Sequence, residues 1–266
     1  MAGKVSDTWE RGDPYERYVG RWSRLVAPQF LDWLNVGAGR RWLDVGCGTG
    51  ALAAAILERC APAALDAVEP SAGFRDAAAR NLAGRAALHA GNAARIPLAD
   101  GSVDAVVSGL VLNFVPDTQL ALREMSRVAA SGGTVAAYVW DYAGKMQLMR
   151  AFWDAAVALD RDAAALDEGP RFPLCRPQAL EQAFRAAGLQ DVTVRPIDIA
   201  TRFADFDEYW QPFLGGQGPA PAYAMSLDEE RRARLREALR ARLAASPDGS
   251  IALIARAWAV RGKAAK

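Results

Sequence analysis

Short apolar runs alternate with stretches of helical periodicity along the first half of the chain. Helices are expected at 51–59, 71–81 and 118–128. Strands are expected at 41–45, 64–68 ending at Glu69, 86–89, 103–108 and, after a turn at Ser131–Gly133, 134–140. Strands that alternate with helices of about ten residues favour right-handed crossovers and a parallel sheet covered on both faces. We therefore expect an α/β fold that binds ligands at the carboxyl ends of its strands.

The pattern changes beyond Trp140. It predicts a helix at 178–187, strands at 192–199 and 250–260, and a long insertion between those two strands. The insertion holds several aromatics, the run GGQGPAP, and a helix for which Ser226 and Glu229 are placed as a capping box. That helix is rich in arginine, but acids share the stretch and its leucines recur at helical spacing. We predict a solvated amphipathic helix rather than a surface for RNA.

Composition narrows the classes of partner and site. The chain has 266 residues, with 32 Lys and Arg against 31 Asp and Glu, for a formal net charge of +1. A protein whose main partner is nucleic acid usually has a basic excess, so none is expected here. Three cysteines and one histidine support neither a disulfide framework nor a zinc site. No apolar run is long enough to span a membrane, and no signal peptide opens the chain, so we expect a cytoplasmic protein without a metal.

The motif WLDVGCGTG at 42–50 is the main candidate for a ligand site. Its glycines follow a strand and precede a helix, where the backbone and the helix N–H groups are able to approach a ligand closely. Glu69 closes the next strand, nineteen residues after Gly50, where a carboxylate accepts hydrogen bonds from the hydroxyls of a ribose. This spacing indicates an adenosine ligand, and the glycine pattern by itself is shared with dinucleotide-binding enzymes.

These residues, together with two further stretches, resemble class I S-adenosylmethionine-dependent methyltransferases. The two stretches are AGNAARIPLADGSVDAVV, which contains Asn92 and Ala93, and SGLVLNFVPD followed by LREMSRVAASGGTV. The resemblance covers about residues 41–140 and is greatest to the small-molecule group that includes the ubiquinone and menaquinone C-methyltransferases. The flanks YERYVGRWSRLVAP and DGSIALIARAWAVRG resemble uncharacterised bacterial members of the group.

The resemblance implies a fold and a set of ligands. It implies one methyltransferase domain over 1–266: a Rossmann-like, doubly wound, seven-stranded sheet with an antiparallel last strand and a small helical cap. Within it, 1–40 form an N-terminal lid, 41–140 the cofactor core, and 141–266 the rest of the sheet with the insertions that cap the substrate. The cofactor is then S-adenosylmethionine, the product S-adenosylhomocysteine, and the partner a small-molecule methyl acceptor. A monomer or a homodimer is expected.

The same resemblance assigns cofactor-binding positions. Members of the family pack the glycine turn against the methionine part of the cofactor and hold the ribose with the acid that follows. The adenine edge meets the loop after the third strand, where Asn92 keeps an acceptor oxygen but lacks the usual aspartate charge. The methionine amino group faces backbone at the end of the fourth strand. The positions in this chain are Gly46, Gly48, Thr49, Glu69, Asn92, Ala93 and Gly109.

Aromatic and cationic side chains precede the first strand. Tyr15, Tyr18, Arg21 and Trp22 suggest a lid, in which Arg21 pairs with the methionine carboxylate and Tyr18 closes the site. The alternative is equally open: the aromatics pack a capping helix, and Arg21 is a solvated cation.

No residue is assigned to catalysis. Methyl transfer from a sulfonium depends on positioning, electrostatics and exclusion of water, so a base is optional. His89 is expected to be structural, and Asn113 stands in the stretch where many relatives carry histidine. Among Asp141, Tyr142 and Tyr209, Asp141 is the best-placed candidate base, although an aspartate in a loop usually forms a turn.

The acceptor pocket is expected from the lid and from 142–172 and 203–222. Aromatics in these segments could line a pocket for a flat or apolar acceptor or could form the core of the cap, and many could do both. They include Trp140, Trp153, Phe172, Phe206, Trp210 and Phe213.

Two other functions remain open. An NAD-dependent oxidoreductase shares the glycine turn and the acid, but Asp44 inside the strand and the Asn92–Ala93 loop argue against it. Asn113 in place of histidine keeps open a protein that binds S-adenosylmethionine without catalysis.

Overall fold

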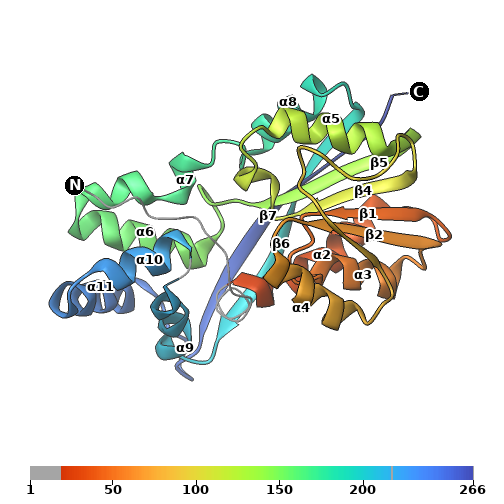
Figure 1. Ribbon diagram of the computed structural model, residues 1–266. Helices are drawn as coiled ribbons and strands as arrows, with labels where there is room; N and C mark the ends of the chain where they lie inside the picture. Colours follow the sequence, from red (N-terminus) through yellow and green to blue (C-terminus); the bar gives the residue numbers. More distant parts are fainter. Residues whose placement is uncertain (1–18, 217, 266) are drawn as a thin grey trace. The chain divides into compact units, whose positions relative to one another are not determined.

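The computed structural model describes residues 19–216 and 218–265, and these form two compact units (Figure 1). The sheet unit consists of 23–140, 174–197 and 257–265. The helical unit consists of 19–22, 141–173 and 198–256. The predictions for Tyr15 and Tyr18 fall outside the described residues.

Seven strands form one sheet in the order β3-β2-β1-β4-β5-β7-β6. Strands β1 to β5 pair in parallel, whereas β7 runs antiparallel to β5. This confirms the predicted Rossmann-like sheet with an antiparallel last strand. The strands are β1 (Arg41–Val45), β2 (Ala64–Glu69), β3 (Ala87–Ala90), β4 (Val103–Gly109), β5 (Ala129–Trp140), β6 (Gln190–Phe203) and β7 (Ile251–Lys263).

Helices cover both faces of the sheet unit. Figure 1 shows α5 and α8 on one face and α2, α3 and α4 on the other. Crossovers between parallel strands are right-handed, so the connecting helices stay on one face while the strand order runs in one direction. They switch to the other face where the order reverses, here between β1 and β4. The helices are α2 (Arg21–Leu34, whose first two residues belong to the helical unit), α3 (Ala51–Arg59), α4 (Ala72–Leu82), α5 (Thr118–Val128) and α8 (Pro177–Ala186).

The core of this unit lies along its central strands. Trp42, Leu43 and Val45 in β1 have no exposed surface, and neither do Val106 and Val107 in β4. Apolar runs of this kind, which Asp44 interrupts in β1, are expected for parallel strands that are buried on both faces. Each such side chain contributes about 2 kcal/mol on burial, so the central strands hold the carboxyl-end loops on a rigid support.

The start of β5 differs from the sequence prediction. Ser131–Gly133 were expected as a turn before the strand, but they lie within it. The strand begins at Ala129, which pairs with Val103 of β4. Further along, the Gly132 amide donates to the Ala264 carbonyl, and the Ala264 amide donates to the Gly133 carbonyl. The register against β4 shifts between Val103 and Ala105. A Cβ at Gly133 would lie 2.7 Å from the Ala130 carbonyl oxygen, so only glycine fits this irregularity.

The helical unit is built from short helices around an aromatic core. Phe152 stacks on Phe213 with ring centroids 4.5 Å apart, and both are fully buried. Its elements are α6 (Gln147–Leu159), α7 (Glu168–Arg171), α9 (Phe206–Trp210), α10 (Pro219–Ser226), α11 (Glu229–Arg242) and the 3-10 turns η3 (Arg161–Leu166) and η4 (Gln211–Gly215). None of the helices in the described ranges combines the length and apolarity that a membrane crossing requires.

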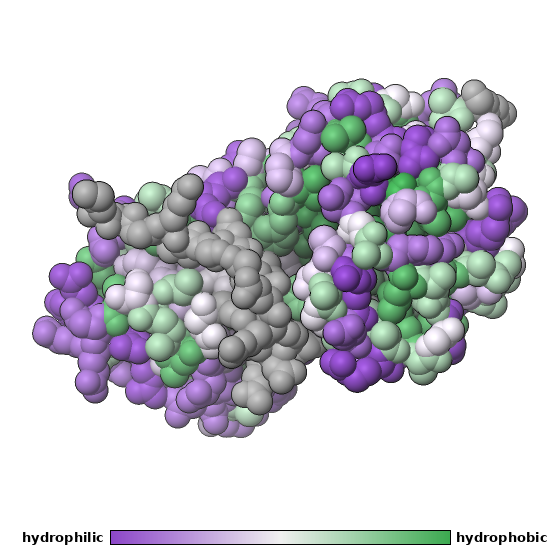
Figure 2. Space-filling model, in the orientation of Figure 1, coloured by the Kyte–Doolittle hydropathy of each residue, from purple (hydrophilic) through white to green (hydrophobic). Residues whose placement is uncertain are grey.

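Helix α11 confirms the predicted amphipathic pattern. Leu235 and Leu239 are buried, whereas its arginines lie on a hydrophilic outer surface (Figure 2). Its N-cap was predicted incorrectly. Asp228 caps the helix, with its Oδ1 accepting from the Arg231 amide at 2.8 Å, while the Ser226 hydroxyl donates to the Tyr223 carbonyl at the end of α10. Asp228 directly precedes the first residue of α11, so its side chain reaches a free amide of the first turn, whereas Ser226 is the last residue of α10.

The correct cap is testable by stability. We expect Asp228→Ala to lower the free energy of unfolding by about 1 kcal/mol, because it leaves the Arg231 amide without its side-chain acceptor. Ser226→Ala is the matched control and should change stability by less than about 0.5 kcal/mol. Urea denaturation followed by circular dichroism measures both, and a larger loss for Ser226→Ala would restore the capping box.

Candidate functional site

The turn between β1 and α3 has three glycines in left-handed backbone conformations. Gly46, Gly48 and Gly50 have φ of +75°, +54° and +90°, which L side chains rarely adopt. The amides of Gly46 and Cys47 both donate to the Val68 carbonyl at the end of β2. A Cβ at Gly48 would meet nothing within 4 Å, so open space lies beside this turn. The geometry suits close approach of a ligand to the backbone.

Glu69 is the acid at the end of β2 and is buried, with 6% of its surface exposed. Its Oε2 accepts from the Gly48 amide at 3.0 Å and its Oε1 from the Ser71 amide at 2.9 Å. Burial raises the pKa of the carboxyl, and these two amides oppose the rise. The carboxylate therefore ties the glycine turn to the start of α4. Each oxygen also has a second lone pair for a ligand hydroxyl.

Asp44 lies in β1, beneath the same turn, and only 1% of it is exposed. Neither carboxylate oxygen has a hydrogen bond of good geometry among the described residues. Burial raises the pKa of Asp44 to about 7, against the pull of the Ala53 backbone amide near the start of α3. A buried carboxyl without a partner is costly, and it commonly marks a functional site.

The Asn92–Ala93 loop follows β3. The Asn92 Oδ1 accepts from the amides of Ala94 and Arg95 at 3.0 and 3.1 Å, and Ala93 is buried. The acceptor oxygen that the sequence assigned to an adenine amine thus also shapes its own loop. This self-contact resembles an Asx turn and presents the neighbouring backbone in a defined orientation.

The end of β4 carries backbone strain. Leu110 has φ of +63°, an uncommon value for leucine, and its amide donates to the Tyr138 carbonyl at 2.8 Å. A Cβ at the preceding Gly109 would lie 2.6 Å from the Tyr138 hydroxyl. The close approach of this ring explains why the position is glycine. Strained backbone of this kind is concentrated at binding sites.

The candidate bases have structural contacts. The Tyr209 hydroxyl donates to the Leu148 carbonyl at 2.9 Å, and Asp141 Oδ2 accepts from the Lys145 amide, as expected of a turn-forming aspartate. His89 Nε2 lies 2.7 Å from Asp66 Oδ1, in keeping with a structural role. Asn113 follows β4, and both polar atoms of its carboxamide are buried without a partner among the described residues.

Arg21 and Trp22 lie in the helical unit. The Arg21 guanidinium donates to Glu208 Oε1 at 2.6 Å and stacks over the rings of Trp22 and Phe203. Its Nε and Nη2 are buried and have no partner in the described ranges. Arg21 is therefore more than a solvated cation, and it retains donors that a carboxylate could satisfy.

The aromatics of the helical unit contact one another. Trp153 meets Phe152 and Tyr223, Trp210 meets Phe213, and Tyr142 lies against Phe172. These rings are all buried. Of the two interpretations offered by the sequence, these contacts favour a core.

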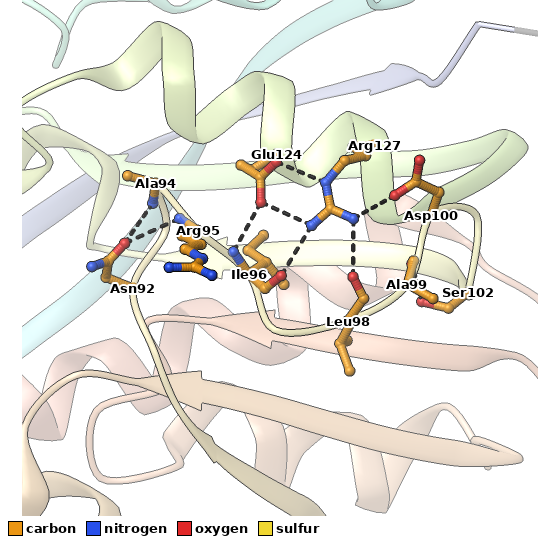
Figure 3. A network of polar contacts seen from close by, with 10 residues as sticks. All are labelled: Asn92, Ala94, Arg95, Ile96, Leu98, Ala99, Asp100, Ser102, Glu124 and Arg127. Carbon is orange, nitrogen blue, oxygen red and sulfur yellow. Dashed lines mark hydrogen bonds and ion pairs between the residues drawn. The ribbon is translucent and has the colours of Figure 1, made fainter.

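Sequence reasoning missed a buried acid in the helical unit and a glutamate–arginine pair in the sheet unit. Glu168 in α7 is 2% exposed and accepts from the Trp153 indole N–H, and burial raises the pKa of Glu168 to about 7. In the sheet unit, Glu124 and Arg127 of α5 point at the loop after β3 (Figure 3). The E-x-x-R spacing on one helix face could have indicated an ion pair, but not its contacts with a distant loop.

The known proteins that this chain resembles in sequence are methyltransferases. A family model described as a methyltransferase domain matches residues 43–137. A demethylmenaquinone methyltransferase of Roseiflexus sp. (strain RS-1) is 30% identical over 220 residues, which cover 70% of this chain and 91% of that protein. An uncharacterized methyltransferase of Mycobacterium tuberculosis (strain ATCC 25618 / H37Rv) is 36% identical over 141 residues, 52% of this chain, and the match spans about half of that relative (51%).

A solved structure supports the same fold. Phosphoethanolamine N-methyltransferase 2 of Haemonchus contortus, in complex with phosphomonomethylethanolamine and S-adenosylhomocysteine, superposes with a TM-score of 0.56. The two chains are 14% identical, and the match covers 96% of this chain and 60% of the other.

The buried carboxyl of Asp44 makes stability depend on pH. The unfolded chain releases this proton near pH 4 and the folded protein near pH 7, so the folded state binds more protons between these values. The free energy of unfolding of the ligand-free protein should fall as pH rises through this window. Between pH 5 and 8 the fall attributable to Asp44 is roughly 2 to 3 kcal/mol.

Urea denaturation at pH 5 and pH 8 tests this expectation. Asp44→Asn should lose less stability over the interval than the parent protein, by that amount. Asp76→Asn, an exposed acid on α4, is the control and should keep the parent profile. Identical profiles for Asp44→Asn and the parent would show that Asp44 does not titrate in this window.

Proposed function

Because the chain belongs to the family of S-adenosylmethionine-dependent methyltransferases, we propose that it transfers a methyl group from S-adenosylmethionine to a small-molecule acceptor. The observation that carries this proposal is the buried Glu69 carboxylate, which lies beside an open glycine turn and bonds to the Gly48 amide. An acid at the end of β2 next to a glycine turn after β1 suits the ribose of an adenosyl ligand.

The residues at this edge of the sheet fit the cofactor. Gly48 leaves open space, the buried Asp44 carries a carboxyl in need of a partner, and Leu110 holds strained backbone at the end of β4. We assign the methionine part to Gly46, Gly48, Thr49 and the backbone of Gly109, the ribose to Glu69, and the adenine edge to Asn92 and Ala93. S-adenosylhomocysteine bound to the Haemonchus neighbour supports the same cofactor class.

Bound S-adenosylmethionine supplies an already activated methyl group on a sulfonium. The chain then has to orient the acceptor in line with that group and exclude water, which are the main sources of acceleration in such a displacement. The carboxamide of Asn113, buried and unpartnered after β4, is suited to hydrogen-bond a polar group of an acceptor. It cannot take a proton at neutral pH. If oxygen or carbon is methylated, the proton of the acceptor is therefore already acidic or is taken by another group such as Asp141.

Relatives suggest the kind of acceptor. Several of them are named demethylmenaquinone methyltransferases, and we propose a small organic acceptor for this chain as well. A balanced charge argues against nucleic acid as the acceptor. Cys47, Cys60 and Cys175 are unbridged, which supports a reducing compartment such as the cytoplasm. A monomer or homodimer, organised as one domain over 1–266, completes the proposal.

Calorimetric titration tests the cofactor site. We expect S-adenosylmethionine and S-adenosylhomocysteine to bind in the micromolar range and NAD not to bind, because the chain belongs to a methyltransferase family. Glu69→Ala should weaken both adenosyl ligands by at least about tenfold, or 1.4 kcal/mol. Glu58→Ala, an exposed acid on α3, is the matched control and should bind as the parent does.

The opposite outcomes are informative. Binding of NAD alone would make the protein an oxidoreductase. Tight adenosyl binding with no methyl transfer to any of a broad panel of acceptors would favour a cofactor-binding protein without catalysis. Unchanged affinity in a folded Glu69→Ala variant would remove the ribose assignment.

The role of Arg21 is tested by a pair of variants. If Arg21 binds the methionine carboxylate, Arg21→Ala should raise the dissociation constant for S-adenosylmethionine at least several-fold, because a charge-assisted contact is lost. Glu208→Gln removes the ion-pair partner but keeps the guanidinium, so its affinity should be equal or tighter. Equal weakening by both substitutions would mean that the Arg21–Glu208 pair only supports the lid. The same lid was expected to involve Tyr18, whose substitution by Phe belongs in the same titration.

A further inference from the structure

The loop between β3 and β4 is bound to α5 by one glutamate and one arginine (Figure 3). The Arg127 guanidinium donates to the carbonyls of Ile96 and Leu98 at 3.0 and 2.9 Å and to Asp100 Oδ1 at 2.6 Å. Glu124 Oε2 accepts from the Ile96 amide at 2.9 Å. Two side chains of a rigid helix thus hold the loop at three of its residues.

The two side chains also hold each other. Arg127 Nε donates to Glu124 Oε1 at 2.7 Å, and its Nη2 donates to Glu124 Oε2 at 2.8 Å. This two-point contact lowers the pKa of Glu124 and raises that of Arg127, so both remain charged. All three guanidinium nitrogens are engaged, and the planar group has one orientation that satisfies every acceptor.

The contacts continue along the loop to Asn92. Ile96, which Glu124 binds, follows Arg95, and the Arg95 amide donates to both the Asn92 carbonyl and its Oδ1. Ala93 is buried between these points. A chain of hydrogen bonds therefore runs from α5 to the pair that we assign to the adenine edge. Strand β3 alone gives this loop little support, because it is four residues long and lies at the edge of the sheet.

We propose that Glu124 and Arg127 are positioning residues that set the selectivity of the site for adenine by fixing the loop Asn92–Asp100. The proposal rests on the proposed function, in which Asn92 and Ala93 contact the adenine edge. In this proposal neither α5 side chain has to touch the cofactor. Their effect is to hold the loop backbone in one place, so that the groups facing the 6-amino edge need no ordering when the ligand binds. A helix on the face of the sheet thereby controls recognition at its edge.

The experiment compares two ligands that differ only at that edge. S-adenosylhomocysteine has the 6-amino group, and S-inosylhomocysteine has a carbonyl oxygen there. We expect the parent protein to bind the adenosyl ligand at least about tenfold more tightly, because a site built for a donor rejects its replacement. In Arg127→Met, adenosyl binding should weaken by about tenfold and inosyl binding by less than about twofold, so the preference should largely vanish.

Three further variants serve as controls. Arg123→Met removes an exposed arginine from the same helix and should leave both affinities unchanged. Arg127→Lys keeps the positive charge, but the single lysine nitrogen is unable to reach all the acceptors that the guanidinium binds. This variant should therefore retain only part of the parent's preference for the adenosyl ligand. Glu124→Gln breaks the network from the other side with little change in size, and it gives the same test if Arg127→Met fails to fold.

The possible outcomes distinguish the positioning proposal for Glu124 and Arg127 from the assignment of Asn92 and Ala93 to the adenine edge. Equal weakening of both ligands in a folded variant would mean a general structural role and would overturn the positioning proposal, as would an unchanged preference. A parent protein that binds S-adenosylhomocysteine but does not discriminate would refute the adenine assignment itself, and the positioning proposal with it. Loss of preference in Arg127→Met, with Arg123→Met unaffected, supports both.

Discussion

The two hydrogen bonds that Glu69 accepts from the Gly48 and Ser71 amides join three elements of the sheet unit. They link the turn after β1, the end of β2 and the start of α4. The parallel register that pairs Val45 with Val68 brings these elements together. Because the acid is buried, its carboxylate has little competition from water for the amides. The candidate site depends on this arrangement, since without it the glycine turn has no defined partner at its edge.

The same edge concentrates features that cost stability. Asp44 is a buried acid without a described partner, and Leu110 adopts a left-handed backbone conformation. Such costs are tolerated where the surroundings are rigid, and here the largely buried strands β1 and β4 provide the rigidity. A cofactor with positive charge would relieve the first of these costs, so the residues that destabilise the free protein are those that suit a ligand.

The helical unit solves a different problem. Its core is aromatic, and rings such as Phe152 and Phe213 stack directly on one another. Arg21 adds a charge to this aromatic environment and is held by Glu208. The family resemblance is the basis on which we propose the cofactor-binding residues, whereas the helical unit carries no motif that indicates an acceptor.

The sequence by itself determined the elements whose signals are local. The strand at 41–45 and the helices at 51–59 and 118–128 have the predicted bounds, because an apolar run, a glycine turn and a helical period each act over a few residues. The sequence also predicted that Glu69 closes the second strand, as it does. Tertiary structure decided what depends on neighbours distant in the chain. Ser131–Gly133 became strand because Ala264 pairs with them, and Arg127 found acceptors at Ile96 and Leu98 because β4 places α5 above that loop. Hydrogen bonds between such segments have no local pattern, since the fold brings their partners together only after the local elements have formed.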